Sequence, residues 1–179
     1  MEGRILSPII LVLFSLLSWA LISINLKPEL RELPIPVKNA SPAHWDKLSY
    51  WYYPWGKSRT HKGIDIFSPH KTPVISPVNG LIVKAGYSAN GGNYLYLLGP
   101  KMRVFYFAHL NSLNSGTFSI VKKYQLLGTV GNTGNAISKP YHLHFSIFSL
   151  LPVIRHYDQK APDGWKKMFN LDPGKLLIN

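Results

Sequence analysis

The sequence predicts a mainly β protein, a small antiparallel β-sandwich or partly closed barrel, preceded by one N-terminal transmembrane helix. The chain of 179 residues contains 14 Gly and 14 Pro, which is too many turn formers for a helical bundle. Short runs rich in β-branched and aromatic residues recur between these turn formers. A long uncharged segment stands apart at the N-terminus. The length suits one domain with a short appendage.

The N-terminal segment runs from Ile5 to Leu26 without a charged residue. As a helix it would extend about 33 Å, enough to cross a hydrocarbon core of about 30 Å. A signal peptide has a shorter apolar region followed by a small-x-small site, whereas Ser18-Trp19-Ala20 lies inside this run. Its length therefore favours a signal anchor over a cleaved signal peptide for residues 1–26. Either alternative exports the rest of the chain, so we expect a single-pass protein of the cell membrane whose domain lies in the periplasm or outside the cell.

Residues 27–43 contain four prolines and are predicted to form a Pro-rich stalk, or alternatively a strand leading into the domain. Ser41 can cap a short helix whose first residue is Pro42. The domain itself is expected to occupy residues 44–179.

The pattern from residue 44 to about Leu151 is typical of short strands bounded by Gly, Pro or Asn. The predicted strands fall within residues 72–80, 81–87, 93–98, 102–110 and 142–147. Their regular spacing favours an antiparallel sandwich or partly closed barrel. The tail from Pro152 to Asn179 is rich in turn formers, so we expect loops and a short closing element there.

Composition excludes several classes of function. The chain has no Cys, which excludes a disulfide framework, a thiol nucleophile and zinc sites built on thiolates. Between Lys47 and Arg155 there are twelve basic residues and a single acidic one, Asp65. A glycosidase needs two carboxylates beside its bond, and this region cannot supply them. The net charge of +12 indicates an acidic partner, which could be nucleic acid, anionic lipid or an anionic cell-wall polymer.

Two short motifs could hold a metal ion. In His142-Leu143-His144 the two imidazoles point to the same face of a strand, although such a pair could simply lie on the surface. His61 and Asp65 would be about 13 Å apart in a straight strand, so sharing an ion requires a bend, which Gly63 permits. If the two residues do not share an ion, His61 is a turn residue and Asp65 is a partner for a nearby Lys or Arg side chain.

Taken together, the motifs supply two imidazoles and one carboxylate. This donor set is typical of catalytic zinc sites that leave one position open for water. His109, at the end of an aromatic run, and the remaining His of the pair could then act as a base or as a donor to the transition state.

These motifs resemble the lysostaphin-type (LytM-like) zinc metallopeptidases that cut peptidoglycan. The first is Arg-x-His-x-Gly-x-Asp at residues 59–65, followed by Thr-Pro-Val at 72–74. The second is Phe-Ala-His-Leu at 107–110. The third is the Gly-Asn-Thr-Gly loop at 131–134 leading to His-Leu-His-Phe at 142–145. The motifs occur in one collinear order, and the resemblance covers residues 45–150.

The resemblance implies one zinc ion bound by His61, Asp65 and His144, with His109 and His142 as the catalytic pair. It further implies a LytM-like β fold and a metalloendopeptidase that cuts peptidoglycan stems or cross-links through a metal-activated water. Members that have lost ligands act as wall-binding or activator modules of other hydrolases, and this is the alternative function. Two departures are the long connection between Gly134 and His142, and Ser146, where many members carry Glu.

Nucleic acid is not expected as a partner. Aromatic residues such as Tyr94, Tyr96, Tyr106 and Phe107 could stack on bases, but their alternation in the strands favours packing in the core. An exported chain also rarely meets nucleic acid. The expected partners are therefore peptidoglycan and, through the N-terminal segment, a membrane. The sequence leaves the oligomeric state open.

Overall fold

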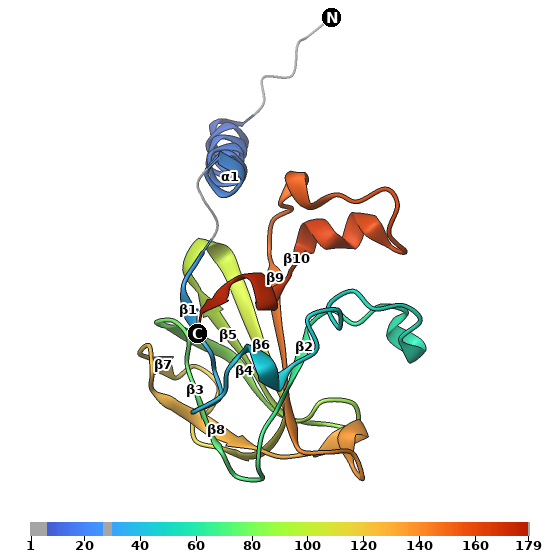
Figure 1. The fold of residues 1–179 in the computed structure, drawn as a ribbon. Coiled ribbons are helices and arrows are strands. Elements are labelled where there is room, and N and C mark those ends of the chain that lie inside the picture. Colours follow the sequence, from blue (N-terminus) through green and yellow to red (C-terminus); the bar gives the residue numbers. More distant parts are fainter. Residues whose placement is uncertain (1–6, 27–29, 179) are drawn as a thin grey trace, which may run out of the picture.

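A helix occupies the N-terminal apolar segment in the computed structural model, which describes residues 7–26 and 30–178 (Figure 1). This helix, α1, spans Pro8–Leu26 and has 19 residues, or about 28 Å of length. Within the residues described, no helix has both the length and the apolar character that a membrane span needs. The predicted transmembrane helix is therefore not supported.

The predicted Pro-rich stalk is in part a piece of the packed domain. Strand β1 (Leu33–Pro34) pairs in parallel with β11 (Leu177–Ile178) near the C-terminus. The side chains of Leu33, Ile35 and Val37 are buried in the hydrophobic core. A strand entering the domain, which was the alternative for residues 27–43, is present at Leu33–Pro34, while residues 27–29 lie outside the described residues. The short helix predicted at Pro42 is present as η1 (Pro42–His44) with Ser41 as its N-cap.

One antiparallel sheet dominates the fold (Figure 1). In the described part of the chain its strands are β2 (Ile64–Phe67), β3 (Pro73–Ile75), β4 (Gly80–Ser88), β5 (Gly92–Gly99), β6 (Arg103–Leu113), β7 (Ile120–Val121), β8 (Leu126–Val130), β9 (His142–Ser149) and β10 (Asn170–Leu171). The order is β10-β9-β6-β5-β4-β7, with β2 paired to β9, β8 to β6 and β3 to β8. The mainly antiparallel β prediction is confirmed.

The sheet branches instead of closing, so the described strands form no closed barrel. Across the described strands, the pairings never return to their starting strand. The branch arises at β6, which pairs with β5 and β9 along its first residues and with β8 from Leu110 onward. A register shift between Leu110 and Ser112 marks the change of partner. Such irregularities bend a strand and redirect its pairing.

The core lies against one face of β6 and β9. Phe105, Phe107 and Phe145 are fully buried there, together with Leu143 and Ile147. Because successive side chains of a strand point to opposite faces, the residues between them face the other way.

Short 3-10 helices connect the strands: η2 (Gly56–Ser58), η3 (Pro100–Met102), η4 (Gly134–Ala136), η5 (Ile154–His156), η6 (Gly164–Phe169) and η7 (Pro173–Lys175).

Replacing Gly63 by Ala is expected to destabilise the fold by about 1–3 kcal/mol, because a Cβ there would lie far inside van der Waals contact with the carbonyl oxygen of Phe145 in β9. Thermal denaturation measures the effect. Gly116→Ala is the matched control, since a Cβ at Gly116 would have no heavy atom within 4 Å. Equal melting temperatures for the two variants would show that close packing at Gly63 does not constrain the fold.

Candidate metal centre and groove

Strand β9 places two histidines on the face opposite the core. His142, His144 and Ser146 line an open groove, while Leu143 and Phe145 between them are fully buried. The alternation is that of a strand with one face in the core, as the sequence predicted for the two imidazoles. On the neighbouring strand β6, Tyr106 and Ala108 line the same groove.

Asp65 and His61 reach this face from β2 and the segment before it. Asp65 is the register partner of His144 in the β2–β9 pair, so the two side chains lie next to each other. The chain bends between His61 and Asp65, and His61 Nε2 lies 3.3 Å from Asp65 Oδ1. Such a bend was expected if the two residues share a site. Gly63 lets this segment approach β9 closely, since a Cβ there would collide with the Phe145 carbonyl oxygen.

Three donor atoms form a closed triangle. His144 Nδ1 lies 2.8 Å from Asp65 Oδ1 and 3.1 Å from His61 Nε2, and His61 Nε2 lies 3.3 Å from Asp65 Oδ1. In a tetrahedral zinc site with ligand distances of about 2.0–2.2 Å, two ligand atoms are about 3.3–3.5 Å apart. The observed distances of 2.8–3.3 Å are slightly shorter, so the three atoms would move apart a little to hold zinc. The described residues hold no other group of three such side chains within ligand reach.

The hydrogen bond that orients His61 favours a cation between the three triangle atoms. His61 Nδ1 lies 2.9 Å from the Ser49 carbonyl oxygen, which can only accept, so Nδ1 donates. In a neutral imidazole Nε2 then carries the lone pair, and it faces the Asp65 carboxylate. Two electron-rich atoms so close repel unless a positive charge lies between them. The residues therefore suit a divalent ion, with the Ser49 carbonyl orienting one ligand from behind.

Asp65 stays ionised in this setting. Burial acts to raise its pKa, but the contacts with the imidazoles of His144 and His61 outweigh burial and hold the pKa well below the ordinary value for Asp. Ionised carboxylate oxygens are ligands for zinc. The only acidic residue of the central region is thus available in the form that a metal ion needs.

His109 and His142 form a second pair beside the triangle, with ring centroids 5.0 Å apart. His109 Nδ1 donates to the Thr133 carbonyl at 2.9 Å, and His142 Nδ1 to the Pro140 carbonyl at 2.7 Å. Both rings are therefore oriented by the backbone, and each keeps Nε2 free to take up a proton. Burial lowers the pKa of His109 to about 4, against the opposing effect of its hydrogen bond to Thr133.

The backbone of His109 is in the left-handed region, with φ of +63°. A non-glycine residue rarely adopts this conformation, which costs free energy that the surrounding structure must supply. The His109 N–H donates to the Gly91 carbonyl at 2.8 Å and fixes the distortion. The distorted backbone lies where β6 changes partner, and the His109 side chain lines the groove there.

Sequence reasoning missed the residues that support the ligands. Trp55 lies over His61, with ring centroids 4.3 Å apart and an angle of 31° between the ring planes. Ser146 Oγ lies 3.0 Å from His144 Nε2, the nitrogen that faces away from the triangle. A period-2 pattern running on from His144 could have placed Ser146 on the groove face. The position of Trp55, before a turn with Gly56 at positive φ, left no such signal.

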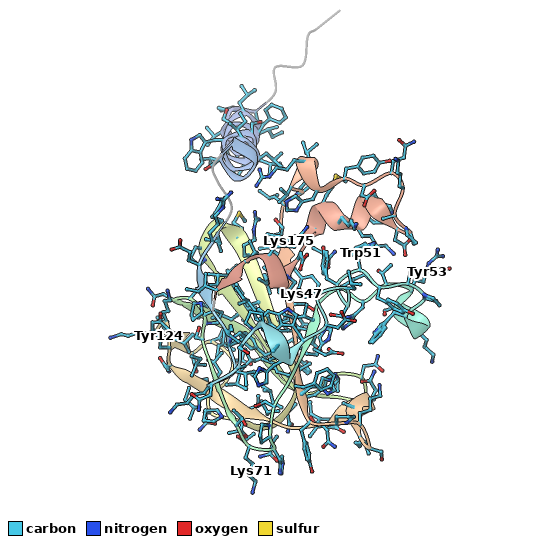
Figure 2. The ribbon with its side chains drawn as sticks, viewed as in Figure 1. Lys47, Trp51, Tyr53, Lys71, Tyr124 and Lys175 are labelled. Carbon is cyan, nitrogen blue, oxygen red and sulfur yellow. The ribbon has the colours of Figure 1, made fainter. Side chains whose placement is uncertain are left out.

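The C-terminal segment also supports His61 (Figure 2). His61 exchanges backbone hydrogen bonds with Trp51 and Tyr52. The buried Trp51 donates its indole N–H to the Pro162 carbonyl at 2.8 Å. Figure 2 shows Trp51 on the side of residues 51–61 that faces the C-terminal η6. An ion pair of 3.2 Å between Arg59 and Asp163 joins the same two segments.

Replacing Trp51 by Phe is expected to lower zinc affinity by about tenfold, because the loss of its hydrogen bond to Pro162 loosens the segment that orients His61. Titration of zinc against a chromophoric chelator measures this affinity. Trp165→Phe is the matched control, since Trp165 lies in the same C-terminal region but is 54% exposed. Unchanged zinc affinity in Trp51→Phe would show that the C-terminal segment does not position the ligand.

The groove around both groups of side chains has a volume of about 780 Å³. One wall comes from the segment around η2 and the other from the connection between η4 and β9, both to the right of the sheet in Figure 1. The triangle and the two further histidines all line it. The volume lies within the range of about 300–1,000 Å³ that is usual for ligand pockets. A peptide could therefore reach all five residues together.

The chain is similar to metalloproteases of several bacteria. It is 29% identical over 92 residues to "Peptidoglycan DD-endopeptidase ShyC" of Vibrio cholerae, which covers 51% of this chain and 21% of that protein. It is 36% identical over 124 residues to an "Uncharacterized metalloprotease" of Haemophilus influenzae, covering 69% and 26% respectively. The matches thus span about a quarter or less of the length of these relatives.

A solved structure supports the same relationship. The catalytic domain of lysostaphin from Staphylococcus simulans superposes with a TM-score of 0.54 at 31% identity, covering 62% of this chain and 86% of that one. The LytM-like fold is therefore confirmed. The model of "Peptidase family M23" matches residues 59–156, which is more than half of the chain and includes the three residues of the triangle and both further histidines. The chain therefore belongs to peptidase family M23.

Proposed function

We propose that this chain is a zinc-dependent endopeptidase that hydrolyses peptide bonds in the stems or cross-links of peptidoglycan. The observation that carries the proposal is the triangle of His61, Asp65 and His144 donor atoms beside two further imidazoles with free Nε2 atoms. The family and the printed activity of the Vibrio cholerae relative support the substrate class. The uncharged N-terminal run and this substrate together support a location outside the cytoplasm.

The residues divide into two groups in the proposed mechanism. His61, Asp65 and His144 would hold the ion, which when bound supplies Lewis-acid polarisation of a peptide carbonyl and of water. His142 or His109 would accept a proton at Nε2 from the attacking water and return it to the leaving amine. Their Nδ1 hydrogen bonds to Pro140 and Thr133 keep Nε2 pointed into the groove and stabilise the protonated ring.

The test is a hydrolysis assay with the full chain, kept soluble in a mild detergent because α1 exposes apolar side chains. Purified sacculi are incubated with the protein, and released peptides are identified by mass spectrometry. We expect release that a chelator abolishes and added zinc restores. Release that requires an added wall amidase would instead support the activator module. No release of either kind would overturn the proposed enzyme.

A further inference from the structure

The charges that line the groove are almost all positive. Lys57, Lys62 and Lys139 contribute to its walls, whereas Asp65 is the only carboxylate in its lining. Lys57 comes from η2 on one wall, and Lys139 from the connection between η4 and β9 on the other. Cations therefore border the triangle from two separate segments of the chain.

These lysines have no ion-pair partner in the described part of the chain. Among the described residues, no carboxylate forms an ion pair with Lys57, Lys62 or Lys139. Lys62 Nζ donates to the Ser58 carbonyl at 2.8 Å, which holds this ammonium group at the groove without cancelling its charge. Lys57 and Lys139 are exposed. By contrast, Lys166, Lys167 and Lys175 outside the groove each have an Asp partner.

Asp65 cannot balance the groove lysines. Its carboxylate is committed to the two imidazoles, and a divalent ion held by the triangle would more than cancel its charge. A peptide lying in the groove would therefore meet a positive field along its length. Such a field favours ligands with negative groups and raises their rate of encounter.

We propose that the groove selects peptides with free carboxylates beside the scissile bond, and discriminates against uncharged oligoglycine bridges. The inference rests on the proposed function and narrows its substrate to the acidic stem peptides of the wall. Lys57 and Lys139 are the specificity-determining residues, because they border the site from opposite walls and have no partner among the described carboxylates. Lys62 contributes to the field but is also tied to its own loop.

The experiment compares three synthetic substrates with the full chain: a cross-linked stem dimer with free carboxylates, the same dimer with these groups converted to carboxamides, and pentaglycine that is acetylated at its N-terminus and amidated at its C-terminus, so that it carries no charge. We expect kcat/KM for the carboxamide dimer to be about fivefold to tenfold lower, mainly through KM, since each partly exposed charge contact contributes a modest factor. The difference should shrink between 50 mM and 500 mM salt. Equal kcat/KM for the two dimers, or preferred cleavage of pentaglycine, would overturn the inference.

Variants assign the selectivity to residues. Lys57→Gln and Lys139→Gln should each reduce the ratio of kcat/KM for the free-carboxylate dimer to kcat/KM for the carboxamide dimer by about twofold to fivefold. Lys122→Gln is the control, because Lys122 is exposed and lies outside the groove lining. An undiminished preference in both groove variants would overturn the assignment to these lysines.

A binding measurement separates this inference from the proposed function. Both dimers are titrated by calorimetry into the zinc-loaded His142→Ala variant, in which binding needs no turnover. Tighter binding of the free-carboxylate dimer supports the inference even if the wild-type chain hydrolyses nothing, a result that would overturn only the endopeptidase. Equal affinities overturn the inference whether or not the wild-type chain is an enzyme.

Discussion

Asp65→Ala is expected to lose zinc and all peptide hydrolysis. The carboxylate is the only anionic donor in the triangle and lies within 3.3 Å of both ring nitrogens. Without it, two imidazoles remain, and they supply neither a third ligand nor a charge to offset the divalent ion. Loss of an outer partner of a ligand already costs about 10–100-fold in metal affinity, so loss of the ligand itself should exceed this range. Zinc content after gel filtration and the dissociation constant from chelator competition measure the effect.

Two comparisons make this result specific. Asp158→Ala removes a carboxylate that pairs with Lys167 outside the groove, and it should retain one zinc per chain. Circular dichroism should show the same β signature for both variants, because Asp65 points away from the core formed by Ile64 and Ile66. A folded Asp65→Ala protein with unchanged zinc affinity would contradict the assignment of Asp65 as a ligand.

Local patterns indicated two candidate halves of a metal site, and the family resemblance implied which three residues would be the ligands. The alternation in β9 fixes which side chains share a face, because period 2 is a property of every strand. The spacing between His61 and Asp65 required a bend, and a glycine between them was the residue that allows one. Strand positions for β4, β5, β6 and β9 also followed from their β-branched and aromatic runs.

Long-range contacts were beyond such patterns. The hydrogen bond from Trp51 to Pro162 joins residues 111 positions apart, and no local spacing indicates it. The burial of Leu33 beside β11 and of Val37 beside Val74 of β3 depends on contacts far apart in the sequence, so the prolines around them suggested a stalk instead. The branching of the sheet at β6 depends on a register shift and a strained His109, which are set by tertiary packing.

His142→Ala should abolish turnover but keep zinc. His142 is not part of the triangle; its ring packs 5.0 Å from that of His109, and its Nδ1 donates to Pro140. Removal of a general acid or base typically costs about 10²–10⁴-fold in rate. Hydrolysis of the stem dimer and zinc content are measured on the same sample, so that the two effects are read separately.

Zinc content and turnover, measured separately, distinguish a catalytic residue from a zinc ligand. His144→Ala should lose both zinc and turnover, because His144 Nδ1 contacts both Asp65 and His61. His44→Ala, outside the groove lining, should lose neither. If His142→Ala also lost its zinc, His142 would belong with the ligands, and the proton transfer would fall to His109 alone. Because the two imidazoles of β9 lie on one face only two residues apart, this double measurement decides which of them holds the ion.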